Sequence, residues 1–119
     1  MAPWWSPFGR VPEVSAQELH DRLMCGEEIQ IIDVRTRQEF ANGHIGGAVN
    51  VPIQSFLRSH PDLGLDSSKP VVTICKTAHR SVPATRVLRR RGFDAAQLAH
   101  GLDEWRRQRL PLELPLIFR

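Results

Sequence analysis

Two short apolar runs constrain the fold of this chain more than any other feature. Residues 29–34 and 71–75 are mostly apolar and rich in β-branched side chains. Such runs are typical of strands that are buried on both faces, as in a parallel sheet covered by helices. The two runs therefore predict an α/β fold.

Weaker strand patterns and several helical patterns surround these runs. One helix is expected to begin at Ser15, with Glu18 at the spacing of a capping box, and to end before Gly26. The further strand candidates are residues 11–14, 49–52 and 96–99. The other helical patterns cover residues 37–42, 54–60, 81–91 and 102–109. Because parallel neighbours need crossover connections, this alternation predicts a parallel sheet with helices on both faces.

Length and composition favour a single domain. At 119 residues and 41% hydrophobic, the chain has enough apolar material for one core and too few residues for two ordinary domains. We expect an N-terminal extension at residues 1–10, a domain at residues 11–110 and a tail at residues 111–119. No apolar run approaches the roughly 20 residues that span a bilayer, and residues 1–5 lack a signal-peptide pattern. We therefore expect a cytoplasmic protein without a membrane contact.

The thiols and imidazoles follow no disulfide or metal-binding pattern. Cys25 and Cys75 are separated by almost half the chain, and the five histidines are scattered. We predict free thiols and no metal. Cys25 is expected to be a bystander near the end of the first helix, and a role as a resolving thiol for Cys75 is the alternative.

Basic residues gather late in the chain without a nucleic-acid motif. The formal net charge is +3, and Arg86, Arg89 and Arg90 recur at the spacing of the solvent-facing side of an amphipathic helix. No aromatic interleaving accompanies them, so we predict a solvated face and no nucleic-acid partner. Apolar residues at both termini suggest a homodimer contact or a surface for another partner.

The stretch from Cys75 to Ser81 carries the chemistry that this sequence predicts. It lies between a buried strand and a helix, and open parallel sheets bind ligands at the carboxyl ends of their strands. A loop that curls over a helix N-terminus presents backbone donors, and Lys76 and Arg80 add full positive charges. The pKa of the Cys75 thiol is therefore expected to fall, which favours the reactive thiolate. The alternative is a buried, inert cysteine at a strand end.

A thiolate in an anion-binding loop suits a two-step sulfur transfer. It attacks the outer sulfur of a small anionic donor such as thiosulfate, expels sulfite and retains the sulfur as a persulfide. A thiophile then removes that sulfur, which predicts ping-pong kinetics with cyanide, a thiol or a protein as the acceptor. No cofactor is expected besides the covalent persulfide on Cys75.

Several segments resemble the rhodanese family in their order and spacing. They are residues 31–35 (Ile-Ile-Asp-Val-Arg), Glu39-Phe40, residues 43–52 (Gly-His-Ile-Gly-Gly-Ala-Val-Asn-Val-Pro), the cysteine loop and residues 101–105 (Gly-Leu-Asp-Glu-Trp). The resemblance implies a five-stranded parallel sheet flanked by helices, a thiosulfate sulfurtransferase activity and Cys75 as the sulfur carrier.

The resemblance also implies roles for individual residues. Backbone amides between Cys75 and Arg80 would hold the transferred sulfur, and Arg80 would bind the incoming anion. The substrate-binding residues are then Lys76, Thr77, Ala78, His79, Arg80 and Ser81. Asp33, Arg35 and His44 occupy motif positions that we expect to hold the loops around the site.

Two positions depart from the family pattern. Ala78 stands where the family loop often carries glycine. If this position requires a positive φ, alanine costs on the order of 1 kcal/mol, and we expect low activity or an unusual acceptor. His100-Gly101 replaces a common glycine pair, which we expect to alter a turn without altering the chemistry.

Two other functions stay open. Related α/β phosphatases and arsenate reductases also place a cysteine and an arginine around a bound anion, but their loop is one residue longer than this one. A non-catalytic rhodanese-like module that binds a partner or relays sulfur within a complex is the second. The sequence also leaves open whether the donor is thiosulfate, a persulfide such as that of glutathione, or a cysteine desulfurase.

Overall fold

The computed structural model describes residues 11–59 and 63–114. Within these ranges, strands and helices alternate along the chain from β1 to α5. The expected N-terminal extension, residue 60 and residues 115–119 of the expected tail lie outside the described residues. The homodimer contact expected through the termini depends largely on these segments and therefore also lies outside the described residues.

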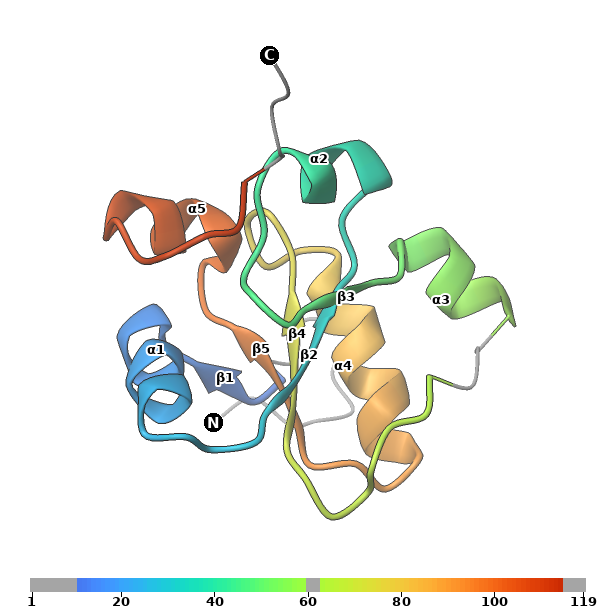
Figure 1. Ribbon diagram of the computed structural model, residues 1–119. Coiled ribbons are helices and arrows are strands. Elements are labelled where there is room, and N and C mark those ends of the chain that lie inside the picture. Colours follow the sequence, from blue (N-terminus) through green and yellow to red (C-terminus); the bar gives the residue numbers. More distant parts are fainter. Residues whose placement is uncertain (1–10, 60–62, 115–119) are drawn as a thin grey trace.

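Five parallel strands form one sheet, which confirms the expected α/β fold. They are β1 (Glu13–Val14), β2 (Gln30–Asp33), β3 (Val49–Asn50), β4 (Val71–Ile74) and β5 (Ala95–Leu98). Their order in the sheet is β1-β5-β4-β2-β3, with β4 at the centre (Figure 1). All residues of β4 are buried, which explains why this strand has apolar and β-branched side chains at consecutive positions.

The helices lie within one or two residues of their predicted ranges. They are α1 (Ala16–Met24), α2 (Arg37–Ala41), α3 (Ile53–Ser59), α4 (Ser81–Arg90) and α5 (Gly101–Arg107). The Ser15 hydroxyl caps α1 by accepting a hydrogen bond from the Glu18 amide at 3.0 Å. The capping box with both side chains engaged forms at α2, between Thr36 and Glu39. In the part of the chain that the structure describes, no helix is long and apolar enough to cross a membrane.

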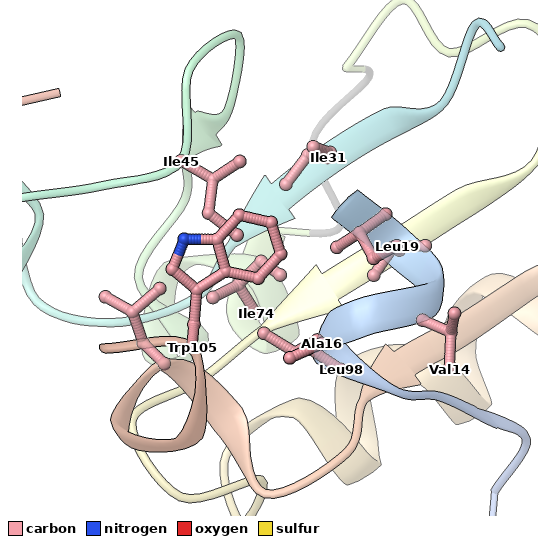
Figure 2. Close-up of a cluster of buried hydrophobic side chains, with 10 residues drawn as sticks. Val14, Ala16, Leu19, Ile31, Ile45, Ile74, Leu98 and Trp105 are labelled. Atoms are coloured by element: carbon pink, nitrogen blue, oxygen red, sulfur yellow. The ribbon is translucent and has the colours of Figure 1, made fainter. Parts of the chain in front are cut away.

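The sheet divides the hydrophobic core into two layers. α1 and α5 lie on one side of the sheet, and α3 and α4 lie on the other (Figure 1). The first layer contains Trp105, which packs in a cluster with Leu19, Ile45 and Ile74 (Figure 2). The second layer contains Phe56 together with side chains from β2, β4 and α4. Each strand at the centre of the sheet therefore contributes to both layers.

The connections that follow β2 and β4 lead toward opposite edges of the sheet. β2 continues to β3 at one edge, whereas β4 continues to β5 in the other direction. Open parallel sheets bind ligands at such switch points, outside the carboxyl ends of the strands. β2 and β4 are neighbours, with Asp33 opposite Ile74. The fold therefore favours a functional site in the loops that follow these two residues.

The N-terminus of α5 packs against the loop that follows β4. The backbone amides of Leu102 and Asp103 donate to the carbonyl oxygens of Cys75 and Lys76 at 2.8 and 3.0 Å. Gly101 adopts φ +66°, and a Cβ atom at this position would lie 2.4 Å from the Lys76 carbonyl oxygen. A side chain at position 101 is therefore incompatible with this contact unless the backbone moves.

We predict that Gly101→Ala lowers the free energy of unfolding by about 3 kcal/mol, because the methyl group meets backbone oxygen and the positive φ is strained. Gly92→Ala is the matched control, since Gly92 also has a positive φ of +92° but no atom lies within 4 Å of the added Cβ. The control is expected to lose about 1 kcal/mol. Urea unfolding measures both losses, and equal losses would contradict the close contact of α5 with the loop.

Candidate active site

Cys75 follows the last residue of β4 and begins the loop that leads into α4. The residue is 1% exposed. Its Sγ atom accepts a hydrogen bond from the Arg80 backbone amide at 3.2 Å, and the Thr77 backbone amide is a second donor. The loop therefore curls around the sulfur with amide groups turned toward it, as in an anion-binding nest of backbone donors.

Opposing effects act on the pKa of the Cys75 thiol. Burial raises this pKa, because a thiolate is less well stabilised away from water. The hydrogen bonds from the Thr77 and Arg80 amides, and the positive charge of the Arg80 side chain, lower it. Their combined effect is larger, so the pKa lies below the ordinary value of cysteine. A larger share of Cys75 is therefore present as the thiolate, the form that reacts with sulfur electrophiles.

Three of the loop residues predicted to bind substrate have exposed side chains, namely Lys76, Thr77 and His79. Lys76 Nζ lies 2.9 Å from a carboxylate oxygen of Asp103 on α5. Thr77 Oγ1 lies 2.9 Å from His79 Nδ1. Thr77 contacts the sulfur through its backbone amide. Because nearly every residue type has this group, the identity of residue 77 does not reveal the contact.

Ser81, also predicted to bind substrate, has its side chain in the protein interior. It is 0% exposed, and its hydroxyl donates to Gln97 Oε1 on β5 at 2.7 Å. Gln97 in turn donates to Glu13 on β1 at 2.9 Å. The hydroxyls of Thr73 on β4 and Thr85 on α4 form a similar buried contact at 2.7 Å. The Ser81 hydroxyl thus attaches the start of α4 to the sheet rather than approaching the sulfur.

The Arg80 guanidinium is bound by Glu39, a residue for which the sequence analysis predicts no role. Its two terminal nitrogens donate to the two carboxylate oxygens of Glu39 at 2.7 and 2.9 Å. These hydrogen bonds are the largest influence on Glu39, whose pKa falls to about 2 despite burial, which raises it. The spacing of Thr36 and Glu39 signals the cap of α2, but the pairing with Arg80 arises only when the two loops meet in the fold.

Asp33 and Arg35 form a buried ion pair at the end of β2. Arg35 donates to the Asp33 carboxylate through Nε at 2.9 Å and through a terminal nitrogen at 2.7 Å. The same terminal nitrogen donates to the Gly43 carbonyl at 2.8 Å. The side-chain amide of Asn50 donates to the carbonyls of both Asp33 and Arg35, at 3.0 and 2.9 Å. Together these contacts join the loop after β2 to the chain around β3.

His44 lies between α2 and the C-terminal segment. Its ring stacks on Phe40 with 3.8 Å between the ring centroids, and its Nδ1 lies 3.0 Å from the Phe40 carbonyl oxygen. Its Nε2 lies 3.3 Å from a carboxylate oxygen of Glu113, and the two residues also form an antiparallel backbone bridge. Leu112 packs against the hydrophobic cluster that contains Trp105. The described part of the expected tail therefore packs on the domain, and His44 contacts it.

The two thiols lie toward opposite ends of the parallel strands. Cys25 caps the C-terminus of α1, on the connection that enters β2 at its amino end, and it is exposed. Cys75 follows the carboxyl end of β4. This arrangement does not bring Cys25 to the Cys75 loop. Within residues 11–59 and 63–114, no three His, Cys, Asp or Glu side chains gather as metal ligands would.

Ala78 adopts φ +70°, the left-handed region in which a Cβ atom is strained. We predict that Ala78→Gly raises the free energy of unfolding by about 1 kcal/mol, because glycine adopts this conformation without the strain. Ala41→Gly, at the exposed last residue of α2, is the matched control and is expected to lose about 0.5–1 kcal/mol. Urea unfolding compares the two variants. A loss in Ala78→Gly as large as that of the control would contradict the strain.

Comparisons with known proteins agree on one family. The family model of the Rhodanese-like domain matches residues 15–108. Thiosulfate sulfurtransferase 16, chloroplastic, from Arabidopsis thaliana is 33% identical, and the match covers 86% of this chain and 93% of that protein. The putative sulfur carrier protein YrkF of Bacillus subtilis is 26% identical, and the match covers 80% of this chain and 51% of that protein.

A solved structure resembles this fold over most of its length. The crystal structure of thiosulfate sulfurtransferase from Pseudomonas aeruginosa has a TM-score of 0.78 and 26% sequence identity. The match covers 89% of this chain but 21% of that one, so the fold corresponds to one part of a longer protein. Because the family model matches most of the chain and a relative of similar length is 33% identical, this protein belongs to the Rhodanese-like domain family.

Proposed function

We propose that this protein is a sulfurtransferase that carries sulfane sulfur as a persulfide on Cys75. The observation that carries the proposal is the position of the Cys75 sulfur in a loop of amide donors, where it accepts a hydrogen bond from the Arg80 backbone amide at 3.2 Å. Relatives named thiosulfate sulfurtransferase and putative sulfur carrier protein support this class of chemistry. Thiosulfate or a persulfide is the donor, and cyanide, a thiol or a protein is the acceptor.

In the first step, the Cys75 thiolate attacks the outer sulfur of the donor. A new S–S bond forms at Sγ, and the bond between the two sulfurs of the donor breaks. Its electron pair leaves with sulfite when the donor is thiosulfate, and with a thiolate when the donor is a persulfide. Amides around the loop then stabilise the persulfide, whose charge lies one atom further out. Because Cys75 is 1% exposed, residues that cover the thiol must separate for the donor to reach it.

In the second step, a thiophilic acceptor attacks the outer sulfur of the persulfide and restores the Cys75 thiolate. The first product leaves before the acceptor reacts, so the kinetics are ping-pong. Both leaving groups depart as anions, and neither step needs a general base. The nearby carboxylates of Asp33 and Glu39 are engaged by Arg35 and Arg80, which suits a mechanism that does not use them as bases.

The burial of Cys75 favours a second candidate, a module that accepts sulfur only from a partner protein. A thiol that is 1% exposed reacts slowly with small molecules unless its loop opens. A docked partner would supply the contacts that open the loop and would deliver its persulfide directly. In this case small donors would leave Cys75 unmodified, whereas a protein persulfide would load it.

We predict that thiosulfate or glutathione persulfide adds one sulfur atom to the wild-type protein, and that Cys75→Ala abolishes both this adduct and sulfur transfer to cyanide. Cys25→Ala, which removes the exposed cysteine, is the matched control and retains both. Intact mass and thiocyanate formation are the measurements. Transfer that survives in Cys75→Ala would contradict the proposal, and loading by protein persulfides alone would favour the relay module. Turnover of an aryl phosphate that depends on Cys75 would indicate a phosphatase.

We predict that the Cys75 thiol titrates below about 8.5, the value of a free cysteine, because the loop amides and the Arg80 charge stabilise the thiolate. Arg80→Gln removes one positive charge and should raise this pKa. Arg89→Gln, near the C-terminus of α4, is the matched control and should leave it unchanged. Thiolate absorbance in a Cys25→Ala background follows the titration. Equal shifts in the two variants would contradict the local effect of Arg80.

A further inference from the structure

Both positively charged side chains of the Cys75 loop have carboxylate partners. Lys76 Nζ lies 2.9 Å from Asp103, and the Arg80 guanidinium binds Glu39 through both of its terminal nitrogens. The charges expected from the sequence to attract an anionic donor are therefore each offset by one negative charge. The pairing leaves less positive charge to bind a sulfur donor that carries negative charge.

The two ion pairs differ in how easily they open. The side chains of Lys76 and Asp103 are 58% and 48% exposed, so water and salt screen their attraction. The side chains of Arg80 and Glu39 are 32% and 28% exposed, and their bidentate geometry gives two charge-assisted hydrogen bonds. The charge of Lys76 is readily available to a ligand, whereas that of Arg80 remains offset.

Glu39 is held in position by its own helix as well as by Arg80. One of its carboxylate oxygens accepts a hydrogen bond from the Thr36 amide at 2.9 Å, and its own amide donates to the Thr36 hydroxyl at 3.1 Å. The lowered pKa of Glu39 keeps the carboxylate ionised at neutral pH. These contacts and the ionised carboxylate favour the state in which Glu39 stays paired with Arg80.

We propose that Glu39 determines donor specificity: by offsetting the charge of Arg80 beside Cys75, it disfavours the thiosulfate dianion and favours organic persulfides, which carry less charge at the reacting sulfurs. This inference rests on the proposed role of Cys75 as the sulfur carrier. A dianion depends more than a monoanion on a free positive charge near the reacting sulfur, because the electrostatic energy scales with the product of the charges.

The chemistry of a persulfide donor balances without any further reactant. The Cys75 thiolate attacks the terminal sulfur of R–S–SH, a bond forms between Sγ and that sulfur, and the S–S bond of the donor breaks. The electron pair of that bond leaves with the thiolate RS⁻, and the proton stays on the new Cys75 persulfide. The negative charge moves from Cys75 to the leaving group, so no additional cation, oxidant or reductant is required.

The test compares two donors that differ by one charge. Methanethiosulfonate, CH₃SO₂S⁻, delivers the same outer sulfur as thiosulfate but carries one negative charge fewer. Glu39→Gln removes the negative charge next to Arg80 and keeps an oxygen that accepts the Thr36 amide, so α2 retains its cap. Glu27→Gln is the matched control, since it also removes one negative charge and Glu27 pairs with Arg22 on the connection that enters β2 at its amino end.

At low ionic strength, the ratio of kcat/KM for thiosulfate to that for methanethiosulfonate should rise about five- to tenfold in Glu39→Gln, mainly through KM for thiosulfate. The ratio should stay at the wild-type value in Glu27→Gln. A purely structural defect would lower both kcat/KM values together and leave the ratio unchanged. An unchanged ratio in folded Glu39→Gln would overturn the inference.

A measurement with Glu39 intact keeps the inference testable even if Glu39→Gln does not fold. In Lys76→Gln, which removes the available charge of Lys76 and leaves Arg80 offset by Glu39, kcat/KM should fall only slightly with ionic strength for both donors. A slope for thiosulfate about twice that for methanethiosulfonate would show that a free positive charge receives the dianion and would overturn the inference. The intact mass of the protein, which reports sulfur loading of Cys75, separates the two proposals. If both donors load Cys75 but the kcat/KM ratio does not change in Glu39→Gln, only the role of Glu39 is refuted. If no donor loads Cys75, the sulfur-carrier function is refuted and this inference with it.

Discussion

The hydrogen bonds between the start of α5 and the carbonyls of Cys75 and Lys76 are the contact on which the rest of the site depends. The first amides of a helix have no partners within the helix, and the last carbonyls of a strand need donors once the neighbouring strand has ended. Here the amides at the start of α5 donate hydrogen bonds to the carbonyls that follow β4, so both groups have partners. With its first carbonyls bound by α5, the loop is free to turn its later amides toward the sulfur. Gly101 makes the approach possible because it has no Cβ.

The loop is held in a strained conformation by its surroundings. Ala78 and His100 both adopt positive φ, at +70° and +61°, and His100 does so in the turn that leads into α5. Such conformations persist where neighbouring contacts determine the backbone more strongly than local preference does. Those contacts include the buried hydroxyl of Ser81 on Gln97, which attaches the end of the loop to the sheet. The strain at Ala78 is therefore maintained by contacts along the whole loop and not by the local preference of alanine.

Ion pairs organise the chain around the sulfur without leaving a large net charge there. Asp33 and Arg35 are almost completely buried, and such a pair contributes little net stability because both charges lose their contact with water. Its effect is positional, since Arg35 also binds the Gly43 carbonyl and so connects two loops. The chain has a net charge of +3, but Arg80, whose charge lowers the pKa of Cys75, is paired with a carboxylate. Overall charge is thus a poor guide to the charge at the site.

The sequence by itself determined the alternation of strands and helices, the parallel sheet and the position of Cys75 between β4 and α4. These features depend on local apolar patterns, helix caps and one motif, all of which lie within short stretches of chain. Only the tertiary structure decided that Arg80 binds Glu39, that the Ser81 hydroxyl faces Gln97 and that His44 contacts Glu113. The physical reason is that the strand order β1-β5-β4-β2-β3 brings the ends of β2 and β4 together, and a side chain's partner depends on which loops meet there rather than on its own neighbours in sequence.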